Sequence, residues 1–265
     1  MTHLKISVPD WCFYSKLAEG PRYYELLGSL GVDGVEMVPP ERHAMARDAG
    51  LAILNQSGPG MQEGLNRLEN HARLLPQIRE SLGSAAAAAI PLVIVFSGNS
   101  AGQADAEGIE NCRRGIEALL PDAERAGVIL GFEMLNTDDH PDYQACHGSY
   151  GFAVAAGLGS PRFKLVYDIY HMERMGDDSA RDIAGNLGLI AHLHVAERPR
   201  RDKPLAKGAI RYGSIVPVIV NAGYDGFWGL EFIPRGDPLS DLRESIGMLR
   251  QAANGSGPWA ASRTQ

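Results

Sequence analysis

Eight short apolar runs recur along the chain, and stretches of helical periodicity separate them. The runs lie near residues 4–8, 34–38, 51–55, 91–96, 128–133, 163–168, 190–195 and 227–232. Between them, segments such as 21–30, 61–88 and 111–126 repeat apolar residues at intervals of three and four, as helices packed on a core do. Strands that alternate with helices pair in parallel, because parallel neighbours need a crossover connection. The pattern therefore predicts an α/β fold with eight parallel strands.

The length of the chain fits one closed set of such repeats. At 265 residues it matches a (β/α)₈ TIM barrel, which runs to roughly 250 residues as one domain. Gly31, Gly127 and Gly223 stand where helices should end, which is a common place for glycine. We expect a single-domain barrel over residues 1–252. The Gly- and Ser-rich end, residues 253–265, is expected to form a flexible tail.

The composition argues against several classes of protein. With 25 basic and 32 acidic residues, the net charge is −7, which would repel a nucleic-acid backbone. No uninterrupted apolar stretch reaches the ~18 residues of a membrane span, and the N-terminus lacks the pattern of a secretory signal. The three cysteines are too few and too scattered for a disulfide scaffold. We expect a cytoplasmic protein that binds neither nucleic acid nor membranes.

Four metal-seeking side chains each stand at the last position of an apolar run. They are Glu133 in VILGFE, Asp168 in FKLVYD, His194 in LIAHLH and Glu231 in FWGLE. A buried carboxylate is costly unless a cation or a partner receives it, and in a barrel the strand C-termini converge on one rim. Three carboxylates and one imidazole suit Mg²⁺ or Mn²⁺, with Zn²⁺ or Co²⁺ left open. Although each acid alone could cap a helix or pair with an arginine, the coincidence predicts one site for a divalent metal ion.

Residues that closely follow these ligands are candidates for binding a substrate. His171 follows Asp168 by three positions, where it could reach substrate oxygens or simply sit in a loop. Arg200 follows His194 by six positions, and a guanidinium there could clamp a carboxylate or a phosphate. The adjacent Arg198 and Arg201 could do the same, so the sequence leaves open which arginine faces the site.

Two further candidates also have structural explanations. Asn136, three residues after Glu133, could orient that carboxylate, bind a hydroxyl group or shape a turn. Glu36 ends the second apolar run in the same style, GVE, and its alternative is an ion pair with His43 or an arginine. Both residues are predicted to bind the substrate.

Loops at the same rim could complete the site. The loop after the Glu133 run carries His140, Tyr143 and, further on, His147, and it is a candidate lid over the barrel mouth. Trp11 and Phe13 follow the first run and could form an apolar wall beside the substrate or plug the barrel.

Four segments of the chain carry a family likeness. They read DHPDYQA, SPRFKLVYDIYHMERMGDD, HLHVAERPRR and GYDGFWGLEFIP. Over roughly residues 30–250 the chain resembles hydroxypyruvate isomerases, within the broader sugar isomerase and epimerase superfamily of xylose isomerase-like TIM barrels. The resemblance implies that the four ligands hold one metal and that Glu133 and Glu231 exchange protons with the substrate. It places the positions of His171 and Arg200 at the substrate, as in ketose epimerases, and implies a homodimer or homotetramer.

The activity implied by the chemistry and the resemblance is an aldose–ketose type isomerisation through a cis-enediolate. A cation that chelates adjacent carbonyl and hydroxyl oxygens acidifies the C–H bond between them. One glutamate removes the proton, and its return to the neighbouring carbon interconverts an aldehyde and a ketone. The resemblance implies hydroxypyruvate and tartronate semialdehyde, or a related small sugar or sugar acid, as the substrate.

Other activities share parts of this prediction. Return of the proton to the opposite face of the same carbon would make a ketose 3-epimerase, and loss of water would make a dehydratase acting on an inosose or dehydroshikimate. A barrel that binds a sugar without turnover would not need the full set of ligands. Apurinic endonucleases of the superfamily use extra histidines at the third and fourth strands, where this chain reads LNQSG and FSGNS. The acidic net charge also argues against DNA repair.

Overall fold

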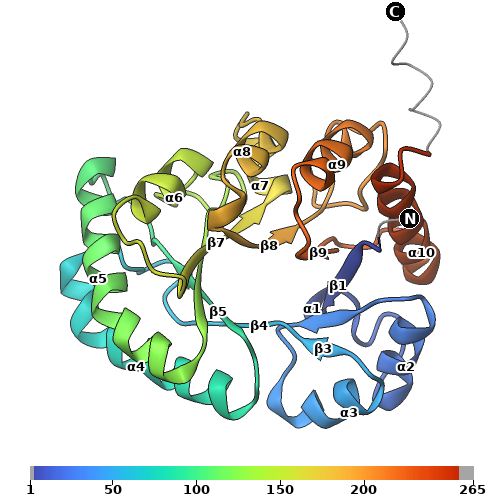
Figure 1. Cartoon of the computed structure of the whole chain (residues 1–265), viewed down its shortest axis with the longest axis horizontal. Helices are drawn as coiled ribbons and strands as arrows, with labels where there is room; N and C mark the ends of the chain where they lie inside the picture. Colours follow the sequence, from blue (N-terminus) through green and yellow to red (C-terminus); the bar gives the residue numbers. More distant parts are fainter. Residues whose placement is uncertain (1–2, 257–265) are drawn as a thin grey trace, which may run out of the picture. The chain divides into compact units, whose positions relative to one another are not determined.

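Parallel strands and helices alternate along the described chain, as the sequence predicts. The computed structural model describes residues 3–256, and these fall into two units (Figure 1). The first unit contains the chain up to Ile53, the short segment Asp178–Leu187 and the segment from Leu193 onward. The second unit contains Leu54–Asp177 and Gly188–His192.

The first unit is built on parallel strands from both ends of the chain. Its strands are β1 (Lys5–Pro9), β2 (Gly34–Glu36), β3 (Ala52–Ile53) and β9 (Phe227–Gly229). They are hydrogen-bonded in the order β3-β2-β1-β9. The strand β8 (Ile190–His194) begins in the second unit, and its last two residues, Leu193 and His194, pair with β9 in the first.

Helices of the first unit follow its strands. They are α1 (Asp10–Phe13), α2 (Pro21–Ser29), α3 (His43–Asp48), α8 (Ser179–Gly185), α9 (Tyr212–Asn221) and α10 (Pro238–Ala253). Helix α9 packs against both α8 and α10 (Figure 1). Its strongly apolar sequence, YGSIVPVIVN, is explained by these contacts, because a helix covered on several sides buries most of its surface.

The second unit repeats the same plan. Its strands are β4 (Asn55–Ser57), β5 (Leu92–Phe96), β6 (Ile129–Glu133) and β7 (Phe163–Asp168), followed by the start of β8, in that order in the sheet. Its helices are α4 (Leu68–Ala87), α5 (Asp105–Ala126), α6 (Gly148–Ala155) and α7 (Ile169–Arg174). Helices α4 and α5 lie side by side (Figure 1).

Close packing within this sheet explains two features of its sequence. Every residue of β5, LVIVF, is buried, as expected for a parallel strand covered on both faces. A Cβ atom at Gly131 in β6 would lie 2.8 Å from a methyl group of Leu92 and 2.9 Å from one of Val166. Only glycine leaves room for these neighbours, two residues before the predicted ligand Glu133.

The predicted strands appear in the structure in the predicted order. All eight predicted strands are present within residues 3–256, but the third appears as two short strands, β3 and β4, on either side of Leu54. The helix expected over 61–88 begins only at Leu68. Each of the three predicted helix-ending glycines has a positive φ, between 69° at Gly127 and 101° at Gly223, which confirms their role.

Two further expectations concern the ends of the chain and the bilayer. Helix α10 ends at Ala253, the first residue of the predicted tail, and residues 257–265 of that tail lie outside the described residues. Within residues 3–256, none of the helices combines the length and the hydropathy needed to cross a lipid bilayer.

Candidate active site

In the first unit, the structure brings together two of the four predicted metal ligands. His194 is the last residue of β8, and Glu231 lies two residues beyond the end of the neighbouring β9. Both side chains are buried. The Nδ1 atom of His194 lies 3.0 Å from Oε2 of Glu231. The pairing of β8 with β9 therefore places these two groups against each other, although they are 37 residues apart in sequence (231 − 194).

Glu36, the last residue of β2, holds the imidazole of His194 from the other side. Its Oε2 lies 2.9 Å from Nε2 of His194, and its Oε1 accepts a hydrogen bond of 2.7 Å from the hydroxyl of Ser7. A carboxylate at Nε2 favours the tautomer that carries its proton there, which leaves Nδ1 as a lone-pair donor toward a metal. Glu36 thus orients a predicted ligand, while His43 bonds instead to the carbonyl of Val38.

Glu231 is held by two side chains, Trp11 from helix α1 and Arg201 from the loop after β8. The indole Nε1–H of Trp11 donates a hydrogen bond of 3.1 Å to Oε1 of Glu231. Arg201 contacts Oε2 through Nη2, and its Nε donates to the backbone carbonyl of Glu231 at 2.9 Å. Of the three candidate arginines, Arg201 is therefore the one whose guanidinium lies at a predicted ligand.

Arg200 and Arg198 are placed elsewhere. The side chain of Arg200 is 69% exposed and pairs with Asp202, 3.2 Å away. Arg198 and Arg200 line a surface hollow of about 590 Å³, together with Asp202, Lys203 and seven other residues. The backbone of Arg201 is left-handed, with φ of 57°, and this turn separates the direction of its side chain from that of Arg200. Counting positions along the sequence could not reveal such a turn.

In the second unit, the other two predicted ligands meet in the same manner. Glu133 and Asp168 are the last residues of the adjacent strands β6 and β7, and both are buried. Each offers a carboxylate oxygen within 4.8 Å of the other. Asp168 also caps α7, because its side chain accepts hydrogen bonds from the backbone amides of Tyr170 and His171, at 2.8 and 3.3 Å. The capping role that the sequence left open for an acid is real here, and it is performed by the Oδ1 oxygen.

His171 and Asn136 lie beside this pair. The backbone N–H of Asn136 donates to Nδ1 of His171 at 3.1 Å, so the neutral ring carries its proton on Nε2. That Nε2 lies 3.5 Å from Oδ2 of Asp168. The side-chain oxygen of Asn136 accepts from the backbone amides of Asp138 and Asp139, which is the turn-forming role considered from the sequence.

The candidate lid loop packs onto the same part of the second unit. The ring of His140 meets that of His171 edge to face, with centroids 5.4 Å apart. The hydroxyl of Tyr143 donates to the backbone carbonyl of Glu133 at 3.0 Å, and burial raises the pKa of this phenol. His147 is 44% exposed and pairs with Asp177 instead. Of the predicted lid residues, His140 and Tyr143 therefore contact candidate site residues, and His147 does not.

The ligand atoms of each pair suit a cation. The 3.0 Å between Nδ1 of His194 and Oε2 of Glu231 matches two adjacent ligands with bonds of about 2.1 Å to one ion, which places them roughly 3 Å apart. The second pair supplies carboxylate oxygens, which hard divalent cations prefer. The described residues thus include buried acidic and histidine side chains that can hold a metal.

Two buried groups of helix α1 have raised pKa values. Burial raises the pKa of the Cys12 thiol well above its ordinary value, and the Glu231 carboxylate raises it further. The thiol is therefore protonated and a poor nucleophile. Burial also raises the pKa of Asp10 to about 6, although the Tyr24 hydroxyl and Arg42 oppose this shift. Both residues belong to α1, which carries Trp11.

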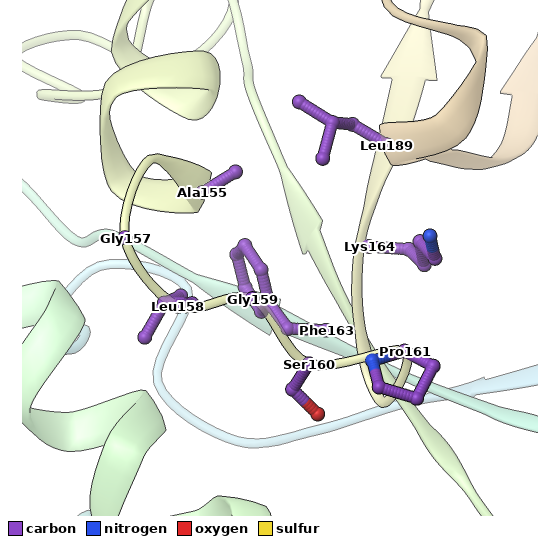
Figure 2. Close-up of a pocket in the computed structure, with 9 residues that line it drawn as sticks. All are labelled: Ala155, Gly157, Leu158, Gly159, Ser160, Pro161, Phe163, Lys164 and Leu189. Atoms are coloured by element: carbon purple, nitrogen blue, oxygen red, sulfur yellow. The ribbon is translucent and has the colours of Figure 1, made fainter.

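A second hollow, of about 500 Å³, lies at the opposite end of β7 from Asp168 (Figure 2). It is lined by the loop that joins α6 to β7 and by the first residues of that strand, together with Leu189. Glycine backbone and apolar side chains such as Leu158 and Phe163 form most of its wall, and Lys164 is its one charged residue among those described. This hollow offers no acid–base pair.

Parallel strands that alternate with helices, with candidate metal ligands at strand C-termini in each unit, define an α/β protein. The family model of the xylose isomerase-like TIM barrel matches residues 24–252, a match that runs through both units. The chain belongs to this family. The prediction of a single-domain (β/α)₈ TIM barrel is thereby confirmed.

Curated relatives carry names of isomerases. The human protein named "Putative hydroxypyruvate isomerase" is 27% identical over 91% of this chain and 94% of its own length. Hydroxypyruvate isomerase of Escherichia coli is 29% identical over 56% of this chain and 55% of its own length, so that match spans about half of each protein. The 2-oxo-tetronate isomerase of Cupriavidus necator is 31% identical over 45% of this chain and 46% of its own. These relatives confirm the prediction that the chain is an isomerase.

Solved structures share the fold. A family 2 AP endonuclease from Brucella melitensis superimposes with a TM-score of 0.80 at 20% identity, covering 92% of this chain and 99% of its own. An L-ribulose 3-epimerase gives 0.79 at 16% identity, with 99% and 100% covered. At these identities the likeness concerns the barrel alone.

Proposed function

We propose that the protein is a metal-dependent isomerase of the aldose–ketose type that acts on a small sugar or sugar acid, and that Glu133, Asp168, His194 and Glu231 together hold one divalent cation. The observation that carries this proposal is the contact of 3.0 Å between Nδ1 of His194 and Oε2 of Glu231, with Glu36 holding the opposite side of the imidazole. A buried imidazole oriented by a carboxylate, with its other nitrogen against a second carboxylate, is the arrangement of a metal ligand.

Two arguments support the addition of Glu133 and Asp168 to the pair His194 and Glu231 as ligands of the same ion. In a TIM barrel, the C-terminal ends of all strands meet at one rim, and Glu133 and Asp168 end the strands β6 and β7. Three carboxylates with one imidazole favour Mg²⁺ or Mn²⁺, and leave Zn²⁺ or Co²⁺ as substitutes. The burial of all four groups supports the same proposal, because such charges need a counter-ion.

The two glutamates are the proposed acid–base pair. A divalent cation supplies polarisation of the substrate oxygens and stabilises the negative charge that develops when a proton leaves carbon. Either Glu133 or Glu231 removes the proton from the carbon that bears the hydroxyl, leaving a cis-enediolate of the substrate. The protonated carboxyl then delivers the proton to the neighbouring carbon, and the hydroxyl proton passes to the former carbonyl oxygen, which completes the interconversion of aldehyde and ketone. His171 holds a substrate oxygen through its Nε2 proton.

The names of the relatives guide the proposed substrate. Hydroxypyruvate and 2-oxo-tetronate, named in two of them, are both small oxo acids with a hydroxyl group near the carbonyl. We propose hydroxypyruvate and tartronate semialdehyde, or a closely related acid, as the substrate pair. A guanidinium recognises a carboxylate well, and Arg201, only 15% exposed and already at Glu231, is the arginine proposed to meet it.

Exchange with solvent deuterium tests this function directly. The Mn²⁺-loaded protein is incubated with hydroxypyruvate in D₂O, and deuterium in the substrate and product is followed by NMR. We expect exchange by the wild type and loss of at least about 100-fold in Glu133→Gln and Glu231→Gln, because an amide cannot carry the proton. Glu110→Gln, an exposed change of the same kind on α5, serves as the control and should exchange normally.

The same incubation, repeated with a ketose or an inosose in place of hydroxypyruvate, distinguishes the related activities by their products. Tartronate semialdehyde supports the isomerase, whereas inversion of a ketose or an unsaturated product from an inosose would replace it with an epimerase or a dehydratase. Normal exchange by both glutamine variants would contradict the proposed acid–base roles.

The setting of the enzyme is also a proposal. The three thiols are free, which fits a reducing compartment, and we propose a cytoplasmic location. We propose a homodimer or homotetramer, which light scattering on the purified protein would test.

A further inference from the structure

The two carboxylate oxygens of Glu231 contact different groups. Oε2 faces Nδ1 of His194 and Arg201. Oε1 accepts the hydrogen bond from the indole of Trp11, at 3.1 Å. If Oε2 is the oxygen that binds the cation, Oε1 is the oxygen left for proton transfer. Among the described residues, Trp11 is the side chain that donates a hydrogen bond to Oε1.

Trp11 is presented to this oxygen by a firmly anchored helix. Its neighbours on α1 are all buried: Asp10 accepts a hydrogen bond of 2.7 Å from the Tyr24 hydroxyl, Cys12 is fully enclosed, and Phe13 packs edge to face on Phe232 at 5.0 Å. The indole itself is 48% exposed. The helix therefore fixes one edge of the ring on Glu231 while its remaining surface faces solvent.

Core packing does not explain this placement. A large aromatic side chain gains most when it is buried, yet here it is the most exposed member of its helix. The guanidinium of Arg201 lies 5.8 Å from the ring centre, so the two side chains form one continuous surface next to Glu231. Such a surface, with an apolar face beside a cation, fits a small molecule that has both C–H groups and a carboxylate.

We propose that Trp11 is a positioning and specificity-determining residue: its N–H fixes Oε1 of Glu231 for proton transfer, and its exposed ring forms the wall against which the substrate carbon chain lies. The proposal rests on the function proposed above. A carboxylate with one oxygen held by a cation can still turn its other oxygen, and the indole N–H stops that rotation. A loss of alignment by about 1 Å can cost on the order of 100-fold in rate.

Two substitutions separate the two roles. Trp11→Phe keeps an aromatic ring and removes the N–H, and we expect kcat to fall by about 10- to 100-fold while KM changes by less than about threefold. Trp11→Ala removes the ring as well, and KM should then rise by at least about tenfold. Val218→Ala, an exposed apolar position on α9, is the control and should leave both constants unchanged.

Metal binding and folding are measured on the same variants. Both Trp11 variants should bind Mn²⁺ with affinity within about threefold of the wild type, because the indole contacts Oε1 rather than the proposed metal-binding oxygen. Their melting temperatures should also stay close to that of the wild type. Retention of kcat in Trp11→Phe, or a parallel loss of Mn²⁺ affinity and kcat, would overturn the positioning role.

A readout independent of turnover distinguishes failure of this inference from failure of the proposed function. Acrylamide quenching of tryptophan fluorescence, taken as the difference between wild type and Trp11→Phe, reports the exposure of Trp11. We expect Mn²⁺ with hydroxypyruvate to protect it. Protection without deuterium exchange would support the wall and reject the isomerase, whereas exchange without protection would support the isomerase and reject the wall.

Discussion

His194 and Glu231 in the first unit are held by side chains remote in sequence, whereas Asp168 and His171 in the second unit are held by backbone amides. Glu36, 158 residues from His194, binds its Nε2, and Trp11, 220 residues from Glu231, binds its Oε1. Asp168, by contrast, accepts from amides two and three residues ahead.

The difference has a physical consequence. A backbone amide stays in place whatever side chain its residue carries, so the second unit's support survives most substitutions. A remote side-chain partner disappears with one substitution and leaves a buried polar group without its hydrogen bond, which costs about 1–3 kcal/mol and more for a charged group. We therefore expect substitutions around His194 and Glu231 to affect metal binding more than those around Asp168.

Glu36 should give the largest effect. Glu36→Ala removes the partner of both His194 and Ser7, and we expect Mn²⁺ affinity to fall by about 10- to 100-fold and the free energy of unfolding to fall by about 3–5 kcal/mol. Glu36→Gln, which can still accept from Nε2, should lose much less. Isothermal titration and urea unfolding measure both quantities, and equal losses in the two variants would remove the special role of this side chain.

Asp10, in the first unit, should make the free energy of unfolding depend on pH. Its pKa is about 6 in the folded protein against 3.8 for the ordinary group, so between these values the folded state binds more protons than the unfolded state. The stability that Asp10 contributes is therefore present below about pH 4 and is lost as pH rises through about 6. Asparagine at position 10 does not titrate. The free energy of unfolding of Asp10→Asn, relative to that of the wild type, should therefore increase by up to about 3 kcal/mol between pH 4 and pH 7. A pH-independent difference in urea unfolding would contradict this.

Asn136 tests the backbone-held unit. Asn136→Ala removes an acceptor for two loop amides, and we expect a loss of about 1–2 kcal/mol in the free energy of unfolding. The backbone N–H that holds His171 remains, so Mn²⁺ affinity should stay within about threefold of the wild type. A loss of metal affinity as large as in Glu36→Ala would break the comparison between the two units.

Arg200 should give the smallest effect. Its exposed pair with Asp202 is a surface ion pair, worth about 0–1 kcal/mol at most. Arg200→Ala should leave the melting temperature, Mn²⁺ affinity and KM nearly unchanged, whereas Arg201→Ala should raise KM for an acidic substrate. If Arg200→Ala raised KM instead, the arginine implied by the family resemblance would be the one that meets the substrate.

The fold could be predicted from the sequence because its signals are local. Apolar runs, helical periodicity and glycines at helix ends each depend on a few consecutive residues, and they gave the order of the strands correctly. The sequence does not predict the break of the third strand into β3 and β4, because the run LAILN carries no residue that marks the interruption. The sequence predicts a start for α4 that is too early, because the periodic apolar pattern continues into the loop before Leu68.

The candidate site could be predicted only in part, for a related reason. Strand ends point to the four proposed ligands, because position along a strand is a local property. The partners of these residues are not local. A polar residue within the apolar strand β1 is a signal that could have identified Ser7 as a partner of Glu36. Nothing in the sequence links Trp11 to Glu231 or Glu36 to His194. Likewise, whether Arg200 or Arg201 contacts Glu231 depends on the left-handed backbone at Arg201, which a segment with three arginines does not reveal.

Titration of Mn²⁺ followed by electron paramagnetic resonance, on the wild type, His194→Gln and Asp168→Asn, tests most directly whether both pairs of ligands share one ion. Asparagine at position 168 can still cap α7, so folding should persist. We predict one ion per chain in the wild type and a loss of at least about tenfold in affinity for that same ion in each variant. Unchanged binding in either variant, or two independent ions in the wild type, would contradict a shared site.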